Sequence, residues 1–131
     1  MRRMNDRGEA ALELAIVAPL LMLLLLGVLQ FGLWYHAQNV VQTAALEASR
    51  VASAEEAASN EGEDRARSVL RAGLGSSVSD PVVSVNLGQE DVRVSVQASM
   101  RGLLPLPGLS EIHLSAESVS YRERFRSEDE Q

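Results

Sequence analysis

The architecture of this chain follows from one stretch, residues 8–35, which read GEAALELAIVAPLLMLLLLGVLQFGLWY. From Leu14 to Tyr35 no residue carries a charge. A helix of about 20 residues, rising about 1.5 Å per residue, crosses a hydrocarbon core of about 30 Å. An amphipathic helix of a soluble domain would have a polar face, whereas apolar residues here occupy all faces. The sequence therefore predicts a membrane span over about residues 14–35.

The basic residues predict the orientation of this span. Three arginines precede it: Arg2, Arg3 and Arg7. The next basic residue along the chain is Arg50. Basic residues beside a span remain in the cytoplasm, so we expect the N-terminus inside and the bulk of the chain outside. Trp34 and Tyr35 lie where an aromatic belt would meet the outer interface, and His36 beside them is expected at the surface rather than as a metal ligand.

Three kinds of N-terminal segment combine basic residues with an apolar run. A cleaved secretory signal has an apolar core of about 7–15 residues and then a small-residue cleavage site, which does not match the longer run here. A plain membrane anchor explains the run but not Glu13, an acid at its edge where charge is costly. The third kind joins a basic leader, a small residue before a scissile bond and an acid five positions later, as in Gly8 and Glu13.

The third pattern resembles a prepilin signal. Residues 7–19, RGEAALELAIVAP, are similar to the start of the TadE-like pseudopilins, which are minor pilins of tight-adherence (Flp, type IVb) pili. The resemblance extends to Gly27, Phe31 and Gly32 and covers roughly the first third of the chain. It departs from the pattern at Leu14, where these signals often carry Phe or Tyr.

The resemblance implies that a prepilin peptidase cuts between Gly8 and Glu9, which removes the leader, residues 1–8. Glu13 lies four residues after the new α-amine on Glu9, about 6 Å along a helix axis. Its carboxylate could pair with that amine or with the amine of a neighbouring subunit. An unpaired charge in a low-dielectric environment costs several kcal/mol. Such a pair would therefore fix the register between subunits during assembly. The alternative is that Glu13 simply lies at headgroup level.

Composition limits the chemistry of the 131-residue chain. It contains no cysteine, which excludes disulfides, thiolate metal sites and a cysteine nucleophile. Its formal net charge of −6 argues against a nucleic-acid partner. His36 and His113 are far apart in the sequence, no serine has a nucleophile-elbow context, and no phosphate loop is evident. We expect no enzyme activity, no metal and no cofactor.

The membrane helix is expected to continue outside, so that one long helix covers residues 9–58. Its outer part has small apolar residues at three-four spacing: Val40, Val41, Ala44, Ala45, Ala48, Val51 and Ala52. Small side chains let backbones approach closely, either to another helix or to the protein's own sheet. Pro19 lies inside the span, where we expect it to kink the helix.

A small extracytoplasmic domain is expected over residues 59–121. Asn60 and Glu63 resemble a capping box, which predicts that residues 60–63 break the long helix and begin a short second one. Four residues form its apolar face: Ala66, Val69, Leu70 and Leu74. Gly73 and Gly75 are expected to end this helix, and residues 76–81 form a turn-rich connector.

Alternating residues predict three antiparallel strands. Residues 83–87 and 92–100 are joined by a plausible hairpin loop at 88–90, and five residues of the second strand share one face: Val92, Val94, Val96, Ala98 and Met100. A third strand over 112–121 changes its apolar phase, which indicates a bulge. Residues 103–109 contain four leucines and are expected to fold back over the sheet, or else to contact lipid or a partner. The charged tail, residues 122–131, is expected to be disordered.

The expected fold is therefore α+β: a long N-terminal transmembrane helix, a short second helix and a small three-stranded antiparallel sheet. The resemblance implies a minor pilin in the cytoplasmic membrane, with a prepilin peptidase, other pilin subunits and the pilus assembly machinery as partners. Assembly would carry it to a cell-surface pilus. Two alternatives stay open: an unprocessed single-pass envelope protein, and a major filament subunit, although major subunits of this class are typically much shorter.

Overall fold

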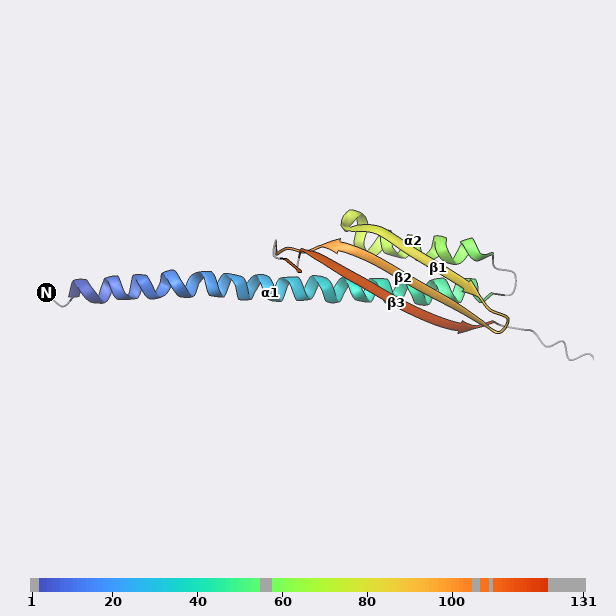
Figure 1. The fold of residues 1–131 in the computed structure, drawn as a ribbon, viewed down its shortest axis with the longest axis horizontal. Helices are drawn as coiled ribbons and strands as arrows, with labels where there is room; N and C mark the ends of the chain where they lie inside the picture. The colour runs from blue at the N-terminus through green and yellow to red at the C-terminus, as the bar shows by residue number, and fades with distance from the viewer. Residues whose placement is uncertain (1–2, 55–57, 105–106, 109, 123–131) are drawn as a thin grey trace, which may run out of the picture.

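The computed structural model describes residues 3–54, 58–104, 107–108 and 110–122. In order, the described elements are α1 (Arg3–Ala52), α2 (Ser59–Leu74), a short 3-10 turn η1 (Gly75–Ser77), β1 (Val78–Leu87), β2 (Asp91–Arg101) and β3 (Glu111–Tyr121). Figure 1 shows that α1 runs along most of the molecule, and that α2 and the sheet lie along its C-terminal half. The predicted α+β fold is confirmed.

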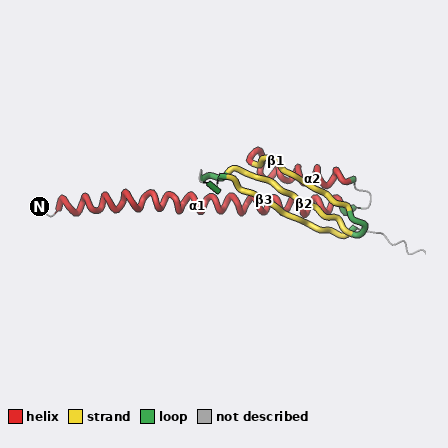
Figure 2. The backbone as a smooth tube through the Cα atoms, in the orientation of Figure 1, coloured by secondary structure: helices red, strands yellow, loops and turns green. Residues whose placement is uncertain are grey.

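The sheet is an antiparallel meander with the strand order β1-β2-β3. As predicted, residues 88–90 connect β1 to β2, and the Gly88 N–H donates to the carbonyl oxygen of Asp91 at 2.8 Å. β1 packs mainly on α2, whereas β2 and β3 pack on α1. Figure 2 shows the resulting arrangement, in which one face of the sheet covers an antiparallel pair of helices.

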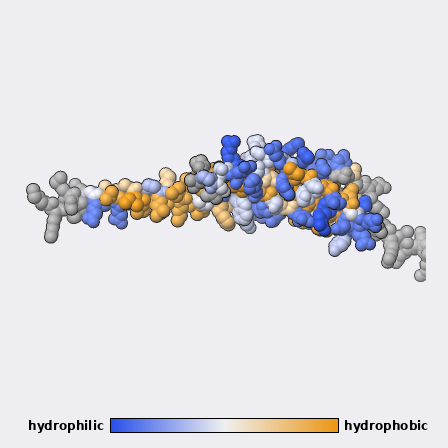
Figure 3. All heavy atoms as spheres, viewed as in Figure 1, coloured by the Kyte–Doolittle hydropathy of each residue, from blue (hydrophilic) through white to orange (hydrophobic). Residues whose placement is uncertain are grey.

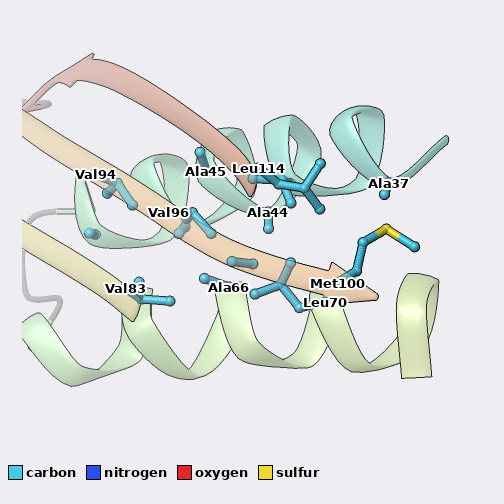
Figure 4. Packing of buried hydrophobic residues seen from close by; sticks show 14 of the residues in the cluster. Ala37, Ala44, Ala45, Ala66, Leu70, Val83, Val94, Val96, Met100 and Leu114 are labelled. Carbon is cyan, nitrogen blue, oxygen red and sulfur yellow. The ribbon is translucent and has the colours of Figure 1, made fainter. Parts of the chain in front are cut away.

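The predicted alternation of β2 is confirmed along the whole strand. Its inward residues are buried: Val92, Val94, Val96, Ala98 and Met100. They meet a helical surface made almost entirely of small residues: Ala37, Val41, Ala44, Ala45, Ala48 and Ala52 from α1, with Ala66 and Leu70 from α2. Figure 4 shows members of this cluster between the sheet and the two helices, with Val94, Val96, Ala44, Ala66 and Leu70 among those labelled. The core is therefore formed by the sheet, α2 and the outer half of α1.

Two glycines of α2 allow the helices to approach closely. A Cβ atom at Gly73 would lie 2.6 Å from Cγ1 of Val40, and one at Gly62 would lie 3.0 Å from Cβ of Ala52. The alanine stripe of α1 thus contacts both a helix and the sheet of its own chain, which are the two kinds of partner expected from its small side chains.

The predicted helix boundaries between residues 52 and 75 are partly wrong. α1 ends at Ala52 rather than near residue 58, and residues 60–63 lie inside α2 instead of breaking the long helix. Ala58 is the N-cap of α2 and makes no side-chain cap hydrogen bond, so Asn60 does not cap the helix. The physical reason is packing, because the glycine at 62 is a contact residue against α1 and not a helix breaker. Gly73 is likewise internal, and only Gly75 ends the helix, at a φ of 56°.

The irregularity in the sheet lies in β1, not in β3. β1 begins at Val78, within the predicted connector, and the register with β2 shifts between Ser79 and Val82. Asp80 has a φ of 45°, and Pro81 has no N–H to donate. Both are tolerated because β1 is an edge strand, where a bulge or proline interrupts only one ladder.

The predicted bulge in β3 is wrong. The register between β2 and β3 is continuous from Asp91↔Tyr121 to Arg101↔Glu111. Ser118 stays on the inward face, where its Oγ lies 2.9 Å from Oγ of Ser49 in α1, and Ser120 Oγ donates to the same Ser49 oxygen at 2.9 Å. On the inward face of β3, hydrogen bonds between serine hydroxyls thus take the place of apolar contacts. Val119 and Tyr121 face outward and are 48% and 81% exposed.

The predicted tail, residues 122–131, lies outside the described residues except for Arg122. The backbone N–H of Arg122 donates to the carbonyl oxygen of Glu90 at 3.0 Å. This bond extends the pairing between β2 and β3 by one residue, beside the turn that joins β1 to β2.

Candidate functional site

The N-terminal half of α1 projects from the domain as an isolated apolar helix. Residues 8–25 are exposed throughout, and the most apolar 18-residue window of α1 is not buried by any other part of the described structure. Figure 3 shows this segment as an almost continuous hydrophobic surface beside a mixed and largely hydrophilic domain. The helix is long and apolar enough to cross a membrane. It indicates a membrane-anchored protein.

The residues predicted to take part in processing all lie near the start of this projecting helix. Gly8, Glu9 and Glu13 are exposed, and a Cβ atom added at Gly8 would meet nothing within 4 Å. Glu9 and Glu13 are four residues apart in a continuous helix, so both lie on the same face, about one turn from each other. No described part of the domain therefore covers these residues, and they are open to a peptidase or to another chain.

At the outer end of the apolar run, α1 meets the loop between β2 and β3. Gln30 is the sole amide in the run from Leu14 to Tyr35, and it is 9% exposed. Its Oε1 accepts a hydrogen bond of 2.7 Å from the backbone N–H of Leu103. A groove of about 490 Å³ lies beside this bond, and its lining includes Phe31, Trp34 and Leu104.

Sequence reasoning missed the contact at Gln30. The signal was present, since a polar residue inside an apolar span normally has a partner. The predicted position of the loop is also corrected: Leu103 and Leu104 lie beside α1 rather than over the sheet, because the loop backbone bonds to Gln30. Residues 105, 106 and 109 lie outside the described residues.

Comparison with known protein families gives a match, and it covers the projecting helix. The model of the family described as TadE-like protein matches residues 8–50. Residues 8–50, which are less than half of the 131-residue chain, are similar to TadE-like proteins. The match confirms the resemblance, and it associates the chain with Tad pili. No curated protein and no solved structure shows significant similarity to the chain.

The TadE-like segment coincides with α1 almost completely. It begins at Gly8 and ends two residues before the helix does, so it contains the projecting span and the helical side of the core. α2 and the sheet lie outside the match. Pro19 lies within the segment, and α1 continues through it, so the expected kink stays a prediction.

The two histidines lie at the surface of the described structure, as predicted for His36. The Nε2 atom of His36 lies 3.4 Å from the carbonyl oxygen of Gly73, near the C-terminal end of α2. His113 faces outward on β3, beside the groove at the outer end of the TadE-like span. Among the described residues, no group of three or more His, Asp or Glu side chains could hold a metal ion.

Proposed function

We propose that this chain is the precursor of a minor pilin of a tight-adherence pilus. The observation that carries the proposal is the TadE-like match, which begins at Gly8 and continues into a helix whose apolar surface is wholly uncovered at its N-terminal end. A helix of this kind suits two successive environments, first the lipid of a membrane and then the helices of other pilin subunits.

In this proposal a membrane peptidase cuts the bond between Gly8 and Glu9. The orientation places residues 1–8 in the cytoplasm, because Arg2, Arg3 and Arg7 precede the span and basic residues remain inside. The domain of α2 and the sheet lies outside the cytoplasmic membrane. The protein is then a substrate of the peptidase and a component of the pilus machinery, and not an enzyme.

Glu13 has the second role in the proposal. Cleavage creates an α-amine on Glu9, one helical turn from the Glu13 carboxylate. The carboxylate is exposed and on an apolar helix, so an assembled filament would leave it in low dielectric without a counter-charge. Pairing with the α-amine of this or a neighbouring subunit removes that penalty, which is several kcal/mol for an orphan charge. The pair would therefore set the register between subunits.

The test of processing compares two glycine-to-valine variants. Gly8→Val places a branched side chain before the proposed scissile bond, and Gly32→Val places the same side chain at a helical position that is equally open. In cells with an active prepilin peptidase, we expect Gly8→Val to accumulate as precursor and Gly32→Val to be processed like the wild type. Intact-mass analysis of the membrane fraction measures both. Equal processing of the two variants would contradict a cut after Gly8.

The same experiment tests the alternative of a permanent membrane anchor. An unprocessed envelope protein would keep its leader in the wild type and in both variants, so the three intact masses would each correspond to a full-length chain.

A further inference from the structure

The loop between β2 and β3 reaches a level that belongs to the predicted membrane span. Gln30, which bonds to Leu103, is five residues before Tyr35, the outer end of that span. At about 1.5 Å per residue, the bond therefore lies about 7.5 Å inside the outer end. The groove beside the loop extends further in, since Gly27 is among its lining residues.

The described loop residues suit contact with lipid. Leu103 is 49% exposed. The groove between the loop and α1 is lined mainly by apolar and aromatic surface, including Phe31, Trp34 and Leu104, and its polar lining residues are Gln30, Glu111 and His113. The rings of Phe31 and Trp34 lie 5.6 Å apart between centroids, so they form one aromatic surface. This surface continues directly into the uncovered apolar surface of α1.

The hydrogen bond between the loop and α1 is of the kind that a bilayer requires. An unpaired backbone N–H or side-chain amide in hydrocarbon costs several kcal/mol, and the bond between Leu103 and Gln30 satisfies one group with the other. Arg101 and Glu111, of opposite charge, are directly paired in the register at the base of the loop. These two residues mark the level of the headgroups, because Leu103 and Leu104 follow Arg101 in the loop.

We propose that Leu103 and Leu104 of this loop enter the outer leaflet of the membrane, and that acyl chains fill the groove between these residues and α1. The chain would then have two contacts with the bilayer, the span and the loop, which together hold the domain close to the membrane surface. Lipid is the occupant because the groove lies within the depth of the span and is continuous with its apolar surface. The proposal depends on α1 crossing a membrane and does not depend on processing or on pilus assembly.

The absence of cysteine from the chain allows a direct test. Leu103→Cys and, at the opposite end of the sheet, Glu90→Cys are each labelled with an environment-sensitive fluorophore. Both positions are exposed, so neither label should prevent folding, which circular dichroism verifies. The full-length variants are placed in lipid nanodiscs at one chain per disc. Quenching is then measured with iodide in water and with spin-labelled lipids that carry the quencher near the headgroup.

We expect the label at position 103 to be quenched several-fold more strongly by the spin-labelled lipid than the label at position 90, and several-fold less strongly by iodide. Trp34, the single tryptophan, provides an internal depth reference and should be quenched by the same lipid. Equal iodide quenching at the two positions would overturn the proposal, since the loop would then lie in water. Protection of position 103 from both quenchers would also overturn it, because protein rather than lipid would cover the loop.

Discussion

Val94 provides the sharpest test of how the outer domain is built. It is fully buried in the middle of β2, opposite Val85 of β1 and Ser118 of β3, and its side chain points toward the helices. Burying a valine stabilises the folded state by about 1.5–3 kcal/mol. Val94→Asp loses this contribution and also buries a carboxylate with no partner, so we expect a loss of about 3–5 kcal/mol. A small domain has a total stability of only about 5–15 kcal/mol.

The measurement uses a soluble fragment comprising residues 36–131, which keeps every buried apolar residue of the described structure. A change of about 1 kcal/mol shifts Tm by about 4–8 °C in a domain of this size, so Val94→Asp should lower Tm by more than about 10 °C or prevent folding. Ser84→Asp is the matched control, because it introduces the same charge on the exposed face of β1. Melting curves that are equally unaffected by the two changes would refute the inward placement of Val94.

Three further predictions concern single residues. Gly73→Val should destabilise the same fragment by about 1–3 kcal/mol through overpacking, because even a Cβ atom there would lie 2.6 Å from Val40; an unchanged Tm would contradict the close helix contact. Ser49→Ala should cost about 1–2 kcal/mol in urea denaturation, since two serine hydroxyls of β3 lose their shared partner; a neutral effect would show that these bonds contribute nothing. Glu13→Gln should leave processing intact but reduce the protein in sheared surface filaments, whereas the control Glu9→Gln should not; equal amounts of both variants would exclude the proposed pairing.

Features encoded by local periodicity could be predicted from the sequence. The span and the strict alternation of β2 are repeated patterns over many residues, so the burial of Val92, Val94 and Val96 follows from the spacing alone. The hairpin at residues 88–90 was equally predictable, because a glycine-containing connection separates two alternating segments.

Features that depend on distant partners could not be predicted in the same way. A glycine can break a helix or permit close packing, and only the opposite residues decide: Ala52 faces Gly62, and Val40 faces Gly73. The inward serines of β3 interrupt the apolar pattern because their partner, Ser49, lies on α1, 69 residues earlier than Ser118. Apolar periodicity contains no information about such a pairing of hydroxyl groups.

Some features of the candidate site could likewise be predicted from the sequence, and others could not. Gly8, Glu9 and Glu13 were found from a local motif, and the structure leaves all three exposed on the projecting helix. The bond between Gln30 and Leu103 joins residues 73 positions apart, so the sequence indicated only that Gln30 needed a partner, without showing which one.

The most direct test of the central claim is the N-terminal residue of the protein isolated from its native membrane. Intact-mass and N-terminal sequence analysis should find a chain that begins at Glu9 in cells with an active prepilin peptidase, and a chain that retains residues 1–8 when the peptidase is inactivated. A chain that keeps its leader in both kinds of cell would contradict the assignment as a pilin precursor.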